Sequence, residues 1–181
     1  IGLPRTLRRL DQSCQVAVLE MGMSAPGEIT LLAQLADPGI GVITNIGEAH
    51  LEMLGSIEAI AAAKEELLDV IGSRGTAVLN ADDPRLQEIG TRFGGKVYTY
   101  GFTRGDIRAT SFSQRRESSY FRVSFPDGEE GSFSLPLPGR HLASNGPNTR
   151  NDALICLIGE AGGSQLFKCR AQIATFSIIG L

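Results

Sequence analysis

The chain has 181 residues, of which 42% are hydrophobic and 20% are charged, and its formal net charge is −3. This length and composition suffice for one domain with a buried core, while the acidic balance argues against a sequence-independent nucleic-acid binder, which needs a basic face. No apolar run approaches the roughly 18 to 20 residues that span a membrane, so we expect no membrane or nucleic-acid partner. The three cysteines (Cys14, Cys156 and Cys169) lack zinc-type spacing, and we therefore expect a protein of the reducing cytoplasm.

Strand and helix patterns alternate through the first hundred residues. Strands are expected at residues 15–20, 39–45, 76–80 and 96–100, the first two of them continuously apolar, as parallel strands are. Helices are expected at residues 28–36 and 57–71, and a turn followed by a short helix at residues 82–92. Ser56 is the expected N-cap of the second helix, and Gly72 is its expected stop. The alternation is typical of a wound α/β sheet.

The pattern changes after Gly101. Strands at residues 107–113, 120–125 and 132–135, joined by polar turns such as Pro126-Asp127-Gly128, predict a small antiparallel β region over residues 102–138. Two further helices are expected at residues 149–161 and 164–174. We therefore predict one α/β domain that carries a small antiparallel insertion.

No glycine-rich phosphate loop is evident in the sequence. The pattern G-x-G-x-x-G is absent, and GTRFGGK at residues 90–96 matches only the first part of G-x-x-x-x-G-K, because Val97 replaces the magnesium-binding Ser or Thr. This segment also runs into a predicted strand, whereas a phosphate loop must open a helix whose amide groups face the anion.

Acidic and imidazole side chains follow the ends of two predicted strands. Glu20 ends the first strand, where ligands gather in open α/β sheets and where a carboxylate can hold magnesium, although it can equally be a solvated strand end. His50 follows the second strand and could share a crevice with Glu20, or it could be a structural hydrogen-bonding residue. Glu48 and Glu52 beside it are explained as well by solvation of the loop.

Lys64 lies on the apolar face of the helix at residues 57–71. A lysine is rarely placed there without a partner or a function. In one interpretation its stem packs on the core and its ammonium reaches a carboxylate at the surface. In the other, burial lowers the pKa of the amine, so that the neutral form attacks carbon dioxide and becomes a carbamate, a carboxylate on a long arm that suits a hard cation.

Asn148 and Asn151 open the helix expected near the C-terminus. Asn148 or Thr149 as the helix N-cap is the simplest explanation. Because the two asparagines are three residues apart, they would also share one helical face and could present their amides to a base edge.

These residues and the segments around them resemble the Mur ligase family. The resemblance is carried by IGLPRTL at residues 1–7, VLEMGMSAPGEI at 18–29, VITNIGEAHLEMLGSIEAIAAAKEEL at 42–67, AVLNADD at 77–83, LPLPGRH at 135–141 and ATFS at 174–177. It covers nearly the whole chain and is strongest toward the branch that adds D-alanyl-D-alanine to UDP-N-acetylmuramoyl-tripeptide. Sister ligases that add the earlier amino acids have a different sequence after Thr44-Asn45.

The resemblance implies a P-loop NTPase-like fold and an ATP-dependent, amide-forming ligase of peptidoglycan precursor synthesis. ATP would phosphorylate the terminal carboxylate of the peptide, and the amine of D-alanyl-D-alanine would attack the acyl phosphate. The implied site has magnesium ligands Glu20 and His50, a carbamylated Lys64 that supports a second magnesium, and nucleotide-binding residues Asn45, His141, Asn148 and Asn151.

One segment departs from the family pattern. Family members run GRHN-x-x-N-A-L directly into the helix, whereas this chain has GRHLASNGPNTRNDAL. Aligned backward from the helix, Asn148 and Asn151 take the places of the adenine-contacting pair. Aligned forward from His141, Leu142 stands where an asparagine belongs and Asn145 takes the second place. We prefer the alignment from the helix, because the helix then continues without a gap.

The resemblance further implies a central ATP-binding domain, over residues 1–181, without its first strand and phosphate loop. The UDP-sugar domain and the C-terminal ligase domain would be absent, so we expect a monomer that does not turn over ATP by itself. Two alternatives stay open at this point. One is another member of the superfamily, such as a different Mur ligase or a folylpolyglutamate synthase-like enzyme, and the other is a catalytically inactive α/β binding module.

Overall fold

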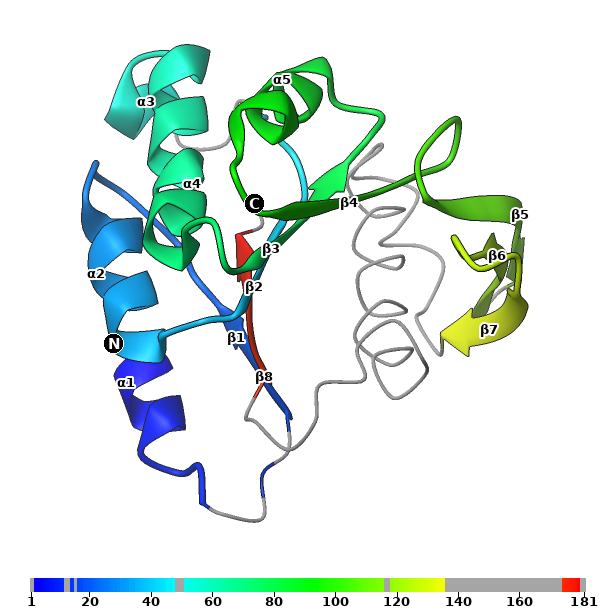
Figure 1. The fold of residues 1–181 in the computed structure, drawn as a ribbon, viewed down its shortest axis with the longest axis horizontal. Helices are drawn as coiled ribbons and strands as arrows, with labels where there is room; N and C mark the ends of the chain where they lie inside the picture. The colour runs from blue at the N-terminus through cyan, green and yellow to red at the C-terminus, as the bar shows by residue number, and fades with distance from the viewer. Residues whose placement is uncertain are drawn as a thin grey trace. The chain divides into compact units, whose positions relative to one another are not determined.

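The computed structural model describes residues 2–11, 14, 16–47, 51–115, 118–135 and 174–179 (Figure 1). The chain divides into two compact units. Unit 1 comprises Ile1–Leu79, Asp83–Val97 and Cys169–Leu181, and unit 2 comprises Asn80–Asp82 and Tyr98–Lys168. No helix in the described parts of the chain is long and apolar enough to cross a membrane.

Unit 1 is built on parallel strands. They are β1 (Val16–Glu20), β2 (Ile40–Ile43), β3 (Thr76–Asn80) and β8 (Ala174–Ile179), in the spatial order β1-β8-β2-β3. The pairs β1–β8, β8–β2 and β2–β3 are all parallel, so their carboxyl ends lie at one edge of the sheet. The predicted wound α/β sheet is confirmed.

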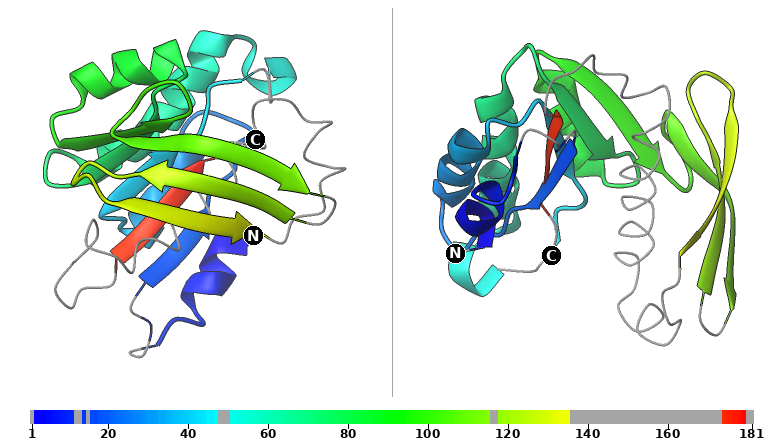
Figure 2. Two further views of the ribbon diagram at one scale, coloured as in Figure 1. Left: turned by 90° about the vertical axis from the view of Figure 1, so that its right-hand side faces the viewer. Right: turned by 90° about the horizontal axis from the view of Figure 1, so that it is seen from below.

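The helices of unit 1 precede β1 or lie between the strands in the chain. They are α1 (Gly2–Leu7), α2 (Glu28–Ala36), α3 (Leu51–Leu54), α4 (Ile57–Ile71) and α5 (Pro84–Arg92). Helices α2 and α4 lie side by side against the sheet (Figures 1 and 2). The predicted caps of α4 are confirmed: Ser56 Oγ accepts a hydrogen bond from Ala59 N at 3.1 Å, and Gly72 ends the helix with a φ of 67°.

The core of unit 1 forms where the apolar side chains of α2, α4 and α5 meet those of the strands. Its fully buried members include Ile29, Ile43, Ile60, Leu67, Leu79 and Leu86. Burying side chains of this size is worth roughly 1.5–3 kcal/mol each. The same core holds α4 against the sheet, and α4 carries Lys64.

Unit 2 contains most of β4 (Lys96–Gly101) and all of β5 (Ile107–Arg115), β6 (Ser118–Ser124) and β7 (Glu130–Leu135). Strands β4 and β5 pair in parallel, and β5, β6 and β7 form the predicted antiparallel meander (Figure 2). The predicted turn between β6 and β7 is confirmed, because Gly128 has a φ of 83° and its N–H donates to Phe125 O at 3.0 Å. The boundaries 102–138 for an inserted β region stay a prediction.

The predicted turn and short helix at residues 82–92 are confirmed: α5 begins at Pro84, which favours the first helical position, and Asp83 provides the cap. Other elements differ from the prediction. Ala174, expected to end a helix, instead begins β8, whose strand character was not predicted. Helices α1 and α3 were not predicted either. The expected helix at residues 149–161, and all of that at 164–174 except Ala174, lie outside the described residues.

Candidate functional site

Glu20 and Asn45 lie at the same edge of the unit 1 sheet. Glu20 ends β1 and pairs in register with Ile178 of β8, which in turn pairs with Val42 of β2. Asn45 follows three residues after Val42. The two strands are separated by one strand, which corresponds to about 10 Å. Glu20 is exposed, so this edge presents a carboxylate at the strand end where the sequence predicted it.

Lys64 is buried on α4 and is held at this edge by Asn45. Only 2% of its surface is exposed, and its Nζ donates to Asn45 O at 2.8 Å and to Asn45 Oδ1 at 3.3 Å. The predicted burial of Lys64 is therefore confirmed. The structure also brings together Lys64 and Asn45, two residues of the predicted site that are 19 positions apart.

The surroundings of Lys64 make its amine unusually acidic. Burial lowers the pKa of Lys64 from 10.5 to about 8, and the negative charge of Asp83 offsets part of that effect. At pH 7 about a tenth of such amines are neutral, whereas an ordinary lysine has almost no neutral fraction. The arrangement can therefore supply a nucleophilic amine at neutral pH, as formation of a carbamate requires.

Asp83 is a residue of this site to which the sequence analysis gave no role. One of its oxygens, Oδ2, accepts from Ile46 N at 2.8 Å, and the other, Oδ1, accepts from Arg85 N at 3.0 Å. The first bond fixes the loop after β2, and the second caps α5. The sequence signals for it were its place in the AVLNADD segment at residues 77–83 and its position directly before Pro84, which favours the first helical position.

Glu66 is a second residue near this edge whose role was not predicted from the sequence. Its carboxylate accepts from Gly27 N at 2.7 Å and from both Thr30 N and Thr30 Oγ1 at 3.0 Å. Helix α2 begins after Gly27, which has no side chain to cap it, so a carboxylate from α4 satisfies its amide groups instead. This fixes the start of α2 and with it the end of the loop that follows Glu20.

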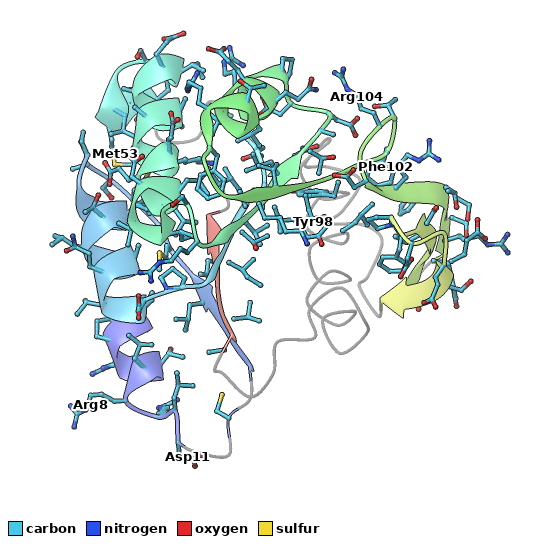
Figure 3. The ribbon with its side chains drawn as sticks, in the orientation of Figure 1. Arg8, Asp11, Met53, Tyr98, Phe102 and Arg104 are labelled. Atoms are coloured by element: carbon cyan, nitrogen blue, oxygen red, sulfur yellow. The ribbon has the colours of Figure 1, made fainter. Side chains whose placement is uncertain are left out.

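The neighbouring Asp82 accepts its hydrogen bonds from residues of unit 2. Its carboxylate accepts from Phe102 N at 2.7 Å, from Thr103 N at 3.3 Å and from Thr103 Oγ1, and so holds the turn after β4. Figure 3 shows Phe102 and the exposed Arg104 in this turn, with Tyr98 on β4. Consecutive aspartates thus organise separate loops.

The residues present fit magnesium in part. Glu20 offers the oxygen ligands that magnesium prefers, whereas the amine of Lys64 becomes an oxygen ligand only as a carbamate. No group of three or more His, Cys, Asp or Glu side chains suited to a metal occurs among the residues that the structure describes. Those residues exclude His50, so the predicted pair of Glu20 and His50 is not tested.

Other predicted residues also fall outside the described part of the chain. They are Glu48, His50, His141, Asn148 and Asn151, together with Leu142 and Asn145 of the alternative alignment. Glu52 lies in the short helix α3. The rejection of residues 90–96 as a phosphate loop is confirmed, because α5 ends at Arg92 and Lys96 begins β4, so the segment opens no helix.

The chain is similar to known proteins over most of its length. The family model for the Mur ligase middle domain matches residues 1–146. A curated relative, the UDP-N-acetylmuramoyl-tripeptide–D-alanyl-D-alanine ligase of Bacillus subtilis (strain 168), is 41% identical over 146 residues, which are 80% of this chain and 31% of that protein. The chain thus spans about a third of the length of that relative.

Solved structures agree with this likeness. A crystal structure of MurF from Acinetobacter baumannii is 29% identical with a TM-score of 0.73, covering 91% of this chain and 35% of that one. The crystal structure of MurF ligase from Thermotoga maritima in complex with ADP is 27% identical with a TM-score of 0.60, covering 78% and 32%. By the match of its first 146 residues to the middle-domain model, the chain belongs to the Mur ligase family.

Proposed function

We propose that this chain is the ATP-binding middle domain of a ligase that joins D-alanyl-D-alanine to UDP-N-acetylmuramoyl-tripeptide in peptidoglycan precursor synthesis. The observation that carries the proposal is the buried Lys64 amine, with a pKa of about 8, held on Asn45 at the carboxyl edge of a parallel sheet. The relative from Bacillus subtilis bears the name of this activity, and the Thermotoga maritima relative was solved with ADP.

In this proposal the residues at the sheet edge hold magnesium and nucleotide. Glu20 and His50 would bind one magnesium, and carbamylated Lys64 would support a second. Asn45, His141, Asn148 and Asn151 would bind ATP. Bound magnesium would neutralise charge on the phosphate oxygens during phosphoryl transfer.

The role of Lys64 follows from its own chemistry. Its neutral amine forms a bond to the carbon of carbon dioxide, one C=O bond opens, and the nitrogen loses a proton to solvent. The product is a carboxylate at the end of the lysine stem. Because α4 is packed into the core of unit 1, this carboxylate would be held in one place, and little conformational entropy would be lost when it binds a cation.

The test is a ligase assay on the complete protein that contains this chain. We expect phosphate release from ATP that requires both UDP-N-acetylmuramoyl-tripeptide and D-alanyl-D-alanine. Lys64→Ala should lower kcat by about a hundredfold or more, because it removes charge stabilisation worth several kcal/mol. Lys96→Ala, at an exposed position at the start of β4, should leave kcat unchanged. Full activity in Lys64→Ala would contradict the proposed role of Lys64.

A further inference from the structure

The peptide group between Asn45 and Ile46 is held from both sides. Its carbonyl oxygen, that of Asn45, accepts from Lys64 Nζ at 2.8 Å. Its N–H, that of Ile46, donates to Asp83 Oδ2 at 2.8 Å. The C=O and N–H of a trans peptide point in opposite directions, so Asp83 and Lys64 approach this single planar group from opposite sides.

The bond from Asp83 to Ile46 is separate from the capping of α5. Capping uses Oδ1, which accepts from Arg85 N, whereas Oδ2 reaches Ile46, 37 positions away in the sequence. A residue needed only as an N-cap could be Ser, Thr or Asn. Both carboxylate oxygens are needed if one side chain is to cap α5 and also hold the loop after β2.

Fixing this peptide also fixes the acceptor of Lys64. Loss of the bond to Asp83 would remove the acceptor of Ile46 N–H and let the Asn45–Ile46 peptide rotate more freely, since it follows the last residue of β2, Ile43, and is outside the hydrogen-bonded ladder of that strand. Rotation would turn the Asn45 carbonyl away from Lys64. A hydrogen bond between charged and peptide groups also polarises the peptide, which strengthens the bond on its other side.

We propose that Asp83 is a positioning residue, which orients the Asn45–Ile46 peptide so that Lys64 is held in one place at the carboxyl edge of the sheet. The structural part of this proposal stands on the two hydrogen bonds. Its importance for the reaction rests on the proposed function of Lys64.

The variant Asp83→Ser separates the two contacts of Asp83. Serine retains the capping of α5 but is too short to offer a second oxygen to Ile46. Asp83→Asn is the second variant, because it keeps the size of the side chain but replaces one acceptor oxygen with a donor. Asp106→Asn in unit 2 is the matched control, since Asp106 likewise accepts from a backbone amide, that of Thr99, at 2.8 Å.

The measurement is the rate at which an amine-acylating reagent modifies Lys64 in the purified 181-residue chain, followed by peptide mass spectrometry. At pH 9.5 the amine of Lys64 is neutral, because this pH is above its pKa of about 8, so the rate reports how often the side chain leaves its buried place. The exposed Lys96 is the internal control in every sample. Circular dichroism checks that each variant is folded.

We expect Asp83→Ser to raise the rate of modification of Lys64 about tenfold to a hundredfold, the change that loss of one hydrogen bond to a charged group produces. Asp83→Asn should give a smaller increase in the same direction. Lys96 should react at an unchanged rate, and Asp106→Asn should match the parent chain. An unchanged rate at Lys64 in both Asp83 variants would overturn the proposal.

The same variants separate this inference from the proposed function. In the complete protein, Asp83→Ser should lower kcat of the ligase reaction and leave the KM for D-alanyl-D-alanine unchanged, because Asp83 acts through Lys64. Faster modification of Lys64 without any ligase activity in the parent protein would refute the proposed function and leave the role of Asp83 supported. Ligase activity with an unchanged rate of modification would refute the role of Asp83 alone.

Discussion

Lys64 combines a long charged side chain with nearly complete burial, and among the described residues Asn45 supplies two acceptors for its amine. Taking an ammonium group out of water costs free energy, and a neutral partner such as a carbonyl group repays only part of that cost. The protein therefore stabilises the neutral amine relative to the charged one. A lysine retained for an ion pair would instead need surroundings that stabilise its charged form.

The first prediction concerns stability as a function of pH. The folded-state pKa of Lys64, about 8, lies below its ordinary value of 10.5, so between these two values the unfolded chain binds more protons than the folded chain. Stability should therefore rise with pH across this window, by about 3 kcal/mol from this group.

Lys64→Met removes this contribution and serves as the reference. Urea unfolding in buffers free of carbon dioxide, at pH 7.5 and near pH 10.5, gives the free energy of unfolding of both proteins. The stability of the parent chain relative to Lys64→Met should increase by about 2–3 kcal/mol between these pH values. A difference that stays constant with pH would show that Lys64 titrates as an ordinary exposed lysine.

At the level of the elements, α4 joins two loops at the carboxyl edge of the sheet. Lys64 contacts the loop after β2, and Glu66 contacts the start of α2. Glu66→Gln replaces one of the two acceptor oxygens that three donors share, so it should lower the free energy of unfolding by about 1–2 kcal/mol. Glu58→Gln, an exposed position on the same helix, should change it by less than about 0.5 kcal/mol. Equal effects in urea unfolding would contradict the capping role of Glu66.

A second prediction at this level concerns the packing of α4 on β2. A Cβ atom added at Gly41 would lie 2.6 Å from Ile71 Cδ1 and 3.0 Å from Leu67 Cδ2, whereas one added at Gly39 would meet nothing within 4 Å. Gly41→Ala should therefore cost about 1–3 kcal/mol of stability through overpacking. Gly39→Ala, on the other side of Ile40, should cost less than about 0.5 kcal/mol. Thermal unfolding of the two variants checks this, and similar melting temperatures would show that α4 does not press on Gly41.

Comparing the observed helices and strands with the predicted ones shows which elements have a local sequence signal. Helices α2 and α4 and strand β3 have the predicted bounds, because helical periodicity and caps such as Ser56 are local signals. Strand β8 was missed because Ala174 was assigned to the end of a helix, although Thr175 and Phe176 favour strands. Its pairing with β1 and β2, which lie at the other end of the chain, has no local signal.

The residues of the candidate site also differ in whether the sequence alone identifies them. Lys64 could be identified because a charged residue on an apolar helical stripe is anomalous within one element. The long-range contacts of Asp83 and Glu66 could not be predicted, because the amide groups of Ile46 and Gly27 lie more than 35 positions away from these carboxylates, and only the folded chain brings them together.

For the molecule as a whole, the chain covers only about a third of the curated relative's length, and we propose that it does not catalyse the full reaction alone. The purified 181-residue chain should release no phosphate from ATP in the presence of D-alanyl-D-alanine. The physical reason is that its one glycine- and lysine-containing candidate, residues 90–96, joins a helix to a strand and directs no helix N-terminus at a phosphate. Phosphate release above the blank that depends on D-alanyl-D-alanine would contradict this.

The chemistry of Lys64 can be tested without the rest of the protein. The measurement is carbon NMR of the purified chain in ¹³C-labelled bicarbonate at a pH near 8, where the amine is about half neutral. We predict a protein-bound carbamate resonance that is absent from Lys64→Met and still present in Lys96→Ala, and that is distinct from the resonance of the N-terminal α-amine, which also reacts with carbon dioxide. The absence of any such resonance from the folded chain, or its persistence in Lys64→Met, would contradict the central claim that burial prepares Lys64 to become a carboxylate.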